Sequence, residues 1–139
     1  MSSNIKFIYA DGNAMCTITY KGLDFMGVAK CHDDDRDFES ERVGMSIAEC
    51  RANIKLLGFM RDHEIKPQLK ILKHLLSNMK NSKNYNPISY EASMLRSQIR
   101  AIEKDLAAIN NAIADERKFL KDYIDGKDKL FKRLRAKNQ

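Results

Sequence analysis

Glycine and proline are scarce in this chain, and long apolar runs are absent. Its 139 residues include six glycines and two prolines. The glycines are scattered, so no glycine-rich loop of the kind that cradles nucleotide phosphates is present, and no GxSxG motif marks a catalytic serine. No apolar stretch approaches the roughly 20 residues that cross a bilayer. We therefore expect neither an enzyme nor a membrane protein.

Cysteine is also sparse. Cys16, Cys31 and Cys50 are odd in number, far apart and without CxxC spacing, which favours reduced core thiols over disulfides or a structural zinc site. The N-terminal sequence, residues 1–4, lacks the basic-then-apolar layout of an export signal. We therefore expect a cytoplasmic protein.

One acidic loop, residues 32–37, is the single cluster that resembles a metal site. It reads His-Asp-Asp-Asp-Arg-Asp. Magnesium and calcium do bind several carboxylate oxygens, but consecutive residues point in divergent directions, and no EF-hand spacing accompanies the loop. His63 and His74 lack partners at ligand spacing. We expect His32–Asp35 to be a solvated loop, and we expect no metal and no cofactor.

Positive charge is concentrated in the second half of the chain. Residues 1–61 hold eight Lys/Arg and nine Asp/Glu, a balance of −1, whereas residues 62–139 hold seventeen and ten, a balance of +7. The density is highest from Lys127 onward. This balance favours anionic partners: nucleic acid, a nucleotide or an acidic protein surface.

The first third of the chain has the alternating pattern of an antiparallel β-meander. Residues 5–9, 14–20 and 23–31 predict three strands, with turns at residues 11–12 and 21–22. Gly27 indicates a bulge or a close backbone approach. A helix over residues 40–61 is expected to cover the sheet through Val43, Ile47, Cys50, Ile54 and Leu57.

The remainder predicts two helices. One begins near Pro67 and runs to Met79, residues 80–87 form a polar loop, and Ser89 caps a long final helix. Gly126 is a position at which that helix is expected to bend or stop. The expected class is α+β, divided into a β-β-β-α core (1–61), a short helix with its loop (62–88) and an oligomerising helix with a basic tail (89–139).

The long helix carries apolar residues at alternating steps of four and three, as in a coiled coil. Forty residues of helix are about 60 Å long, whereas a compact monomer of this length has a radius of gyration of roughly 14 Å. We therefore predict a homodimer or higher homo-oligomer joined along this seam. The predicted interface residues are Leu95, Ile99, Ile102, Leu106, Ile109, Ile113 and Leu120, and the seam is interrupted at Glu116 and Lys127.

A cluster near the start of the long helix has the chemistry to hold a nucleotide. Arg96 and Arg100 share one helical face close to a loop with Tyr85, Asn86 and Tyr90. Guanidinium groups bind phosphate, an aromatic ring stacks on a base, and an asparagine reads its edge. The alternative is that the basic residues are coiled-coil flanks paired with Glu103, Asp105 and Glu116.

Part of the chain resembles small proteins of bacteriophages that infect Firmicutes. The resembling pattern is a strand ending GxAxC, an acidic loop, and a helix with spaced glycine, alanine and arginine. The residues that carry it are Gly27–Cys31, His32, Asp37, Phe38, Gly44, Ala48, Arg51 and Ala52.

Within that group, a β-meander followed by a long oligomerising helix is similar to the Thoeris anti-defence sponges. The resemblance implies non-catalytic sequestration of a cyclic nucleotide immune signal, of the cyclic ADP-ribose or cyclic oligonucleotide type, in the host cytoplasm. It implies a pocket at Arg96, Arg100, Tyr85, Asn86 and Tyr90, and a second pocket at Arg51 and Asn53. Two alternatives remain open: a nucleic-acid-binding phage protein, and an inhibitor that binds a host defence protein directly.

Overall fold

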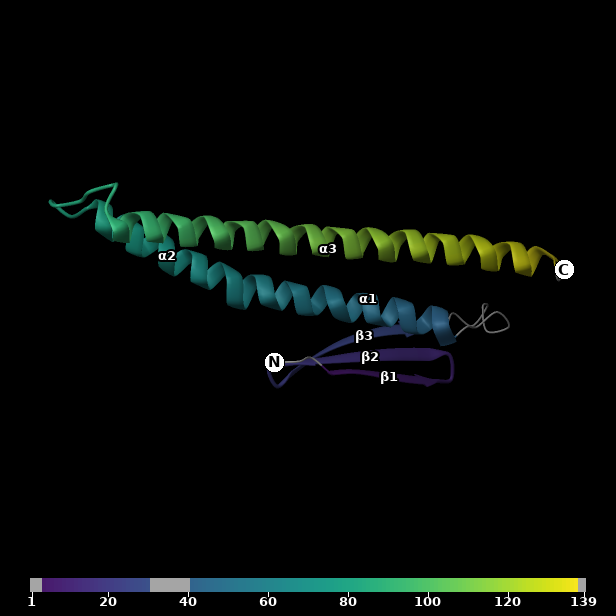
Figure 1. Ribbon diagram of the computed structural model, residues 1–139. Helices are drawn as coiled ribbons and strands as arrows, with labels where there is room; N and C mark the ends of the chain where they lie inside the picture. The colour runs from purple at the N-terminus through teal and green to yellow at the C-terminus, as the bar shows by residue number, and fades with distance from the viewer. Residues whose placement is uncertain (1–3, 31–40, 138–139) are drawn as a thin grey trace. The chain divides into compact units, whose positions relative to one another are not determined.

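The computed structural model describes residues 4–30 and 41–137. An antiparallel sheet at the N-terminus is followed by helices that include a long C-terminal one (Figure 1), so the expected α+β class is confirmed. The elements are β1 (Asn4–Ala10), β2 (Asn13–Tyr20), β3 (Leu23–Lys30), α1 (Glu41–Met60), the π-helix η2 (Arg61–Ile65), α2 (Lys66–Lys80) and α3 (Tyr90–Lys137).

Contacts within the chain group it into two compact units. The first unit comprises Met1–Leu57 and Ile113–Gln139, and the second comprises Gly58–Ala112. The expected division at residues 61 and 88 follows chain order, whereas these units follow contact in space, and α3 contributes to both of them.

The sheet of the first unit is a three-stranded meander with strand order β1-β2-β3. Both connections are two-residue turns, Asp11-Gly12 and Lys21-Gly22. All four residues have positive φ, between 52° and 78°. Positive φ at both central positions is what a type I′ turn requires, and this turn matches the twist of the flanking strands. The strands and turns therefore form where the alternating pattern predicted them.

Alternate residues of β2 form the centre of the core in the first unit. Ala14, Cys16 and Ile18 are 0%, 0% and 1% exposed. They pack with Ile47, Ala48 and other residues of α1, and the C-terminal part of α3 packs against the same cluster. Within this unit α1 therefore lies between the sheet and the end of α3 (Figure 1).

Gly27 allows α1 to approach β3 at backbone distance. A Cβ built on Gly27 would lie 2.0 Å from the carbonyl oxygen of Ala48 and 2.5 Å from the amide nitrogen of Ala52. Both helix residues are alanines and fully buried. The expected close approach at Gly27 is confirmed, and small residues on both elements make it possible.

Three expectations about the helices need correction. No break separates the helices expected at 40–61 and from Pro67, because η2 continues α1 directly into α2. Cys50 does not face the sheet, because its thiol contacts Glu116 of α3. The helix neither ends nor is interrupted at Gly126, since α3 runs on to Lys137.

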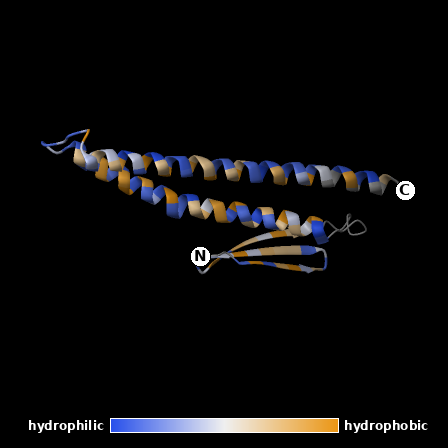
Figure 2. Ribbon diagram, viewed as in Figure 1, coloured by the Kyte–Doolittle hydropathy of each residue, from blue (hydrophilic) through white to orange (hydrophobic). Residues whose placement is uncertain are grey.

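The second unit is a helical hairpin. α2 and the first part of α3 lie side by side, joined by the expected polar loop (Figure 1). The Nζ of Lys73 lies 3.6 Å from Oε2 of Glu103, and hydrophilic and hydrophobic residues alternate around both helices (Figure 2). The Ser89 hydroxyl accepts a hydrogen bond from the Ala92 amide at 3.3 Å, so the predicted cap of α3 is confirmed.

Substitution Gly27→Ala tests the packing of α1 on the sheet. The added methyl group meets backbone rather than a flexible side chain, so we expect a loss of about 3 kcal/mol in the free energy of unfolding, measured by urea denaturation. Gly58→Ala in α1 is the matched control, because nothing lies within 4 Å of its added Cβ. The control is expected to gain about 0.5–1 kcal/mol. Equal stability of Gly27→Ala and the native chain would contradict this packing.

Candidate functional site

The apolar seam of α3 is largely covered within one chain. Ile99, Ile109 and Ile113 are only 8%, 7% and 3% exposed, and the other predicted interface residues, Leu95, Ile102, Leu106 and Leu120, are half-buried. In the first unit, Leu120 packs against the cluster formed by the sheet and α1. The seam thus has partners without a second molecule, and self-association along it stays a prediction.

Glu116, which interrupts the seam, has a specific partner on α1. The Cys50 thiol donates a hydrogen bond to Oε2 of Glu116 at 2.9 Å and lies 3.2 Å from the Glu116 carbonyl oxygen. Cys50 is 3% exposed. Burial, and then the Glu116 carboxylate, raise the pKa of this thiol to about 12. A pair of this kind explains why a carboxylate is tolerated among apolar residues, and it makes Cys50 a structural rather than a reactive cysteine.

The loop before α3 brings together three of the residues predicted to bind a nucleotide. Arg96 donates hydrogen bonds to the Tyr85 hydroxyl at 3.4 Å, to the Ser93 hydroxyl at 3.4 Å and to the Pro87 carbonyl oxygen. The Asn86 side-chain oxygen accepts from the Ile88 amide at 3.1 Å. These polar groups therefore fasten the loop onto α3.

The other two predicted residues of that cluster, Tyr90 and Arg100, are exposed to solvent. Tyr90 is 73% exposed. Arg100 is exposed, and within the described residues it makes no hydrogen bond or ion pair. Of the five predicted residues, Tyr85, Asn86 and Arg96 contact groups of the loop and helix, while Tyr90 and Arg100 face solvent.

The second predicted pair is Arg51 and Asn53, and the two side chains contact different parts of the first unit. The Arg51 guanidinium donates to the Val28 carbonyl oxygen of β3 at 2.6 Å. Asn53 lines a hollow of about 280 Å³ together with Cys50, Glu116 and other residues of α1 and α3. The structure therefore does not bring these two side chains to one site.

A basic face on the second unit is a feature that the sequence analysis missed. α2 holds four lysines and no acidic residue. Lys66, Lys70 and Lys73 recur at steps of four and three, so they lie on one side of the helix. The contact of Lys73 with Glu103 places this side next to α3, where Arg100 lies one turn before Glu103. We call Lys66, Lys70, Lys73, Lys80 and Arg100 the basic face.

Two of these lysines have a carboxylate neighbour. Lys66 lies 3.4 Å from Asp62 and Lys73 lies 3.6 Å from Glu103. The Arg61 guanidinium, and then Lys66, hold the pKa of Asp62 below its usual value. Within the described residues Lys70, Lys80 and Arg100 have no such partner, so the basic face keeps excess positive charge.

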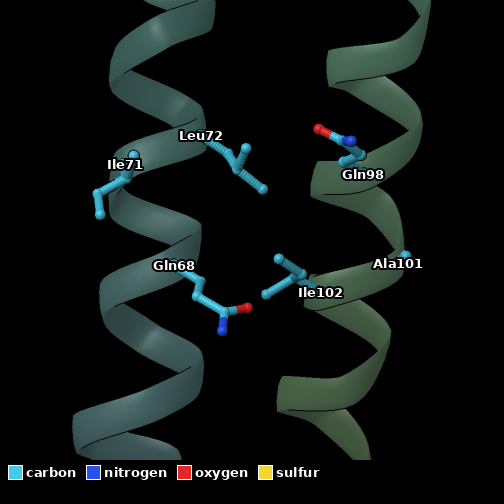
Figure 3. Close-up of a pocket in the computed structure, with 6 residues that line it drawn as sticks. All are labelled: Gln68, Ile71, Leu72, Gln98, Ala101 and Ile102. Carbon is cyan, nitrogen blue, oxygen red and sulfur yellow. The ribbon is translucent and has the colours of Figure 1, made fainter.

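An apolar groove lies between α2 and α3 on a different side of the hairpin. It has a volume of about 450 Å³ and is lined by Gln68, Ile71, Leu72, Gln98, Ala101 and Ile102. Figure 3 shows Leu72 and Ile102 pointing toward each other between the two helices. Ile71 and Leu75 remain 61% and 48% exposed. The hairpin therefore presents basic residues on one flank of α2 and apolar residues on another.

Other expected features find no added support in the described part of the chain. The acidic loop His32–Asp35 lies outside the described residues, as does Cys31. Across residues 4–30 and 41–137, no group of three potential metal ligands is found. Nor is any of the described helices both long enough and apolar enough to span a bilayer. Comparisons with known protein families, curated proteins and solved structures find no match.

Alkylation of native protein tests the Cys50–Glu116 pair. Because the thiolate is the reactive form, we expect Cys50 to resist alkylation at pH 9, where an exposed thiol of pKa 9.0 is half ionised. The folded pKa lies above the unfolded one, so the stability that this thiol contributes is present below pH 9 and is lost between pH 9 and about 12. Mass spectrometry of the labelled chain reports the site. If Cys50 of the folded chain in buffer is alkylated as fast as Cys50 of the chain unfolded in urea, the predicted protection of this thiol is wrong.

Proposed function

We propose that this chain is a non-catalytic binding protein whose second unit binds nucleic acid through the basic face. One observation carries the proposal: α2 has four lysines, no acidic residue, and three of the lysines on one side. The whole hairpin, Gly58–Ala112, holds nine Lys/Arg and five Asp/Glu, a balance of +4. An excess of this kind attracts phosphates regardless of base sequence.

The spacing of the lysines suits a linear polyanion. Steps of four and three residues place Lys66, Lys70 and Lys73 about 6 and 4.5 Å apart along the helix axis. Successive phosphates of one strand lie about 3.4 Å apart along the duplex axis, so lysines at this spacing reach a run of neighbouring phosphates. Flexible lysine side chains act as point charges and do not demand one fixed geometry. The proposal therefore implies binding with little sequence preference and a strong dependence on salt.

The triple substitution Lys66→Gln, Lys70→Gln and Lys73→Gln tests this function. Each lost phosphate contact reduces the slope of log affinity against log salt by about 1, so we expect the slope for duplex DNA to fall by about 2–3 and affinity at low salt to fall at least tenfold. Fluorescence anisotropy over a salt series measures both.

The control removes the same charge from exposed positions of the first unit. It combines Lys55→Gln, Lys118→Gln and Lys121→Gln, all outside the hairpin. The proposal requires the control to keep most of the salt slope. If both triple variants lose the same amount of affinity and salt slope, DNA binding depends on the net charge of the chain and not on the basic face. If the native chain does not bind DNA, the proposal is wrong.

We also propose, as a second candidate, capture of a cyclic nucleotide signal that serves a phage against host defence. The observation in its favour is that Tyr85, Asn86 and Arg96 gather at one loop. Arg100, which has no ion-pair partner among the described residues, lies one turn further along α3. An aromatic ring, an amide and two guanidinium groups match a phosphorylated nucleoside. Capture is stoichiometric, so it requires affinity near the nanomolar range, about −12 kcal/mol.

Native mass spectrometry distinguishes the two candidates. Chain purified from cells with an active cyclic-nucleotide defence is expected to retain a ligand of defined mass, and Arg100→Gln is expected to lose it. Lys70→Gln, which removes one positive charge from α2, is the control that keeps the ligand. Native chain without any retained mass, or equal retention by both variants, contradicts capture at this loop.

A further inference from the structure

The two edges of the sheet are protected to different degrees. At β3, Arg51 donates to the outward carbonyl oxygen of Val28 at 2.6 Å and so occupies part of that edge. β1 is the opposite edge (Figure 1). It contains no proline, it pairs with β2 without a bulge, and Lys6 is its single charged residue. Natural sheets usually protect an edge strand from pairing with another chain by means of charged residues, prolines or bulges. Of these devices, β1 has only the single charge of Lys6.

The outer side of β1 presents both backbone groups and apolar side chains. Ala10 and Asn13 flank a two-residue turn, so their backbone groups face each other. Because the pattern alternates, the backbone groups of Ile5 and Phe7 point away from β2. Their side chains lie on the α1 side of the sheet and are still 48% and 41% exposed.

We propose that β1 pairs antiparallel with β1 of a second copy, about a two-fold axis through Phe7. Phe7 is the central residue of the seven-residue strand, so this register pairs all seven positions. Phe7 meets the second copy's Phe7 in a hydrogen-bonded pair, and Ile5 lies opposite Tyr9. Lys6 lies opposite Ile8, which is 59% exposed, so no two like charges face each other.

Charge favours a second copy here over the hairpin. The first unit, residues 1–57 and 113–139, carries +2, and the sheet itself, residues 4–30, carries +1, so two copies meet at this edge with weak repulsion. The apolar groove between α2 and α3 belongs to a unit of +4, where a second copy is repelled. The product is a six-stranded sheet in a homodimer, with the covered seam of α3 undisturbed.

Paired charge substitutions at residue 7 test this register. Phe7→Lys places two ammonium groups opposite each other, and Phe7→Glu places two carboxylates. Each variant alone is expected to raise the dimer Kd at least tenfold in sedimentation equilibrium, and an equal mixture is expected to recover a heterodimer. Leu23→Lys, a half-exposed residue of β3 on the same face of the sheet, is the control that keeps the dimer.

Hydrogen exchange of the native chain gives a second test that needs no variant. The amides of Ile5 and Phe7 are expected to gain protection as protein concentration rises, while the amides of β3 do not. A native chain that stays monomeric, or a dimer that both Phe7 variants leave intact, overturns the proposal. Loss of DNA binding with the dimer intact would instead affect only the proposed function.

Discussion

Burial of the apolar stripe of α3 inside a single chain is the constraint on which the other features depend. Ile99, Ile109 and Ile113 are nearly inaccessible, and each such side chain contributes about 1.5–3 kcal/mol when fully buried. A dimer joined along this stripe must first expose these residues and then bury them again. A dimer joined at β1 needs no such exchange, because Ile5 and Phe7 are already accessible in the monomer.

The sequence predicted those parts of the fold that are determined by neighbouring residues. The alternation of apolar and polar residues predicted the three strands, and the dipeptides Asp11-Gly12 and Lys21-Gly22 predicted the turns between them. Gly27 indicated the close approach of α1 to β3. The continuous passage from α1 to α2 was missed because a π-helix has no distinctive composition. The partner of the seam was missed as well, since a heptad pattern shows which face is apolar and says nothing about whether the covering helix belongs to the same chain.

For the candidate site, the sequence predicted proximity better than it predicted roles. Tyr85, Asn86 and Arg96 do gather at the start of α3, but they bond to groups of the loop and helix, which depends on a turn geometry that spacing alone does not reveal. The basic face was missed for a different reason. The predicted charge was a sum over residues 62–139, and such a sum does not show that the lysines of α2 recur at helical steps on one side.

Both units have accessible apolar side chains, but the hairpin carries more positive charge than the sheet, and this difference in charge separates what the two regions can bind. The hairpin carries +4, which attracts polyanions and disfavours contact between copies. The edge strand belongs to a sheet of only +1, residues 4–30, with exposed Ile5 and Phe7, so contact between copies meets less repulsion there. Two copies joined at β1 therefore carry two basic faces on one particle. When both reach the same strand, the second contact is intramolecular, so a weak, salt-sensitive face gains affinity without any new contact.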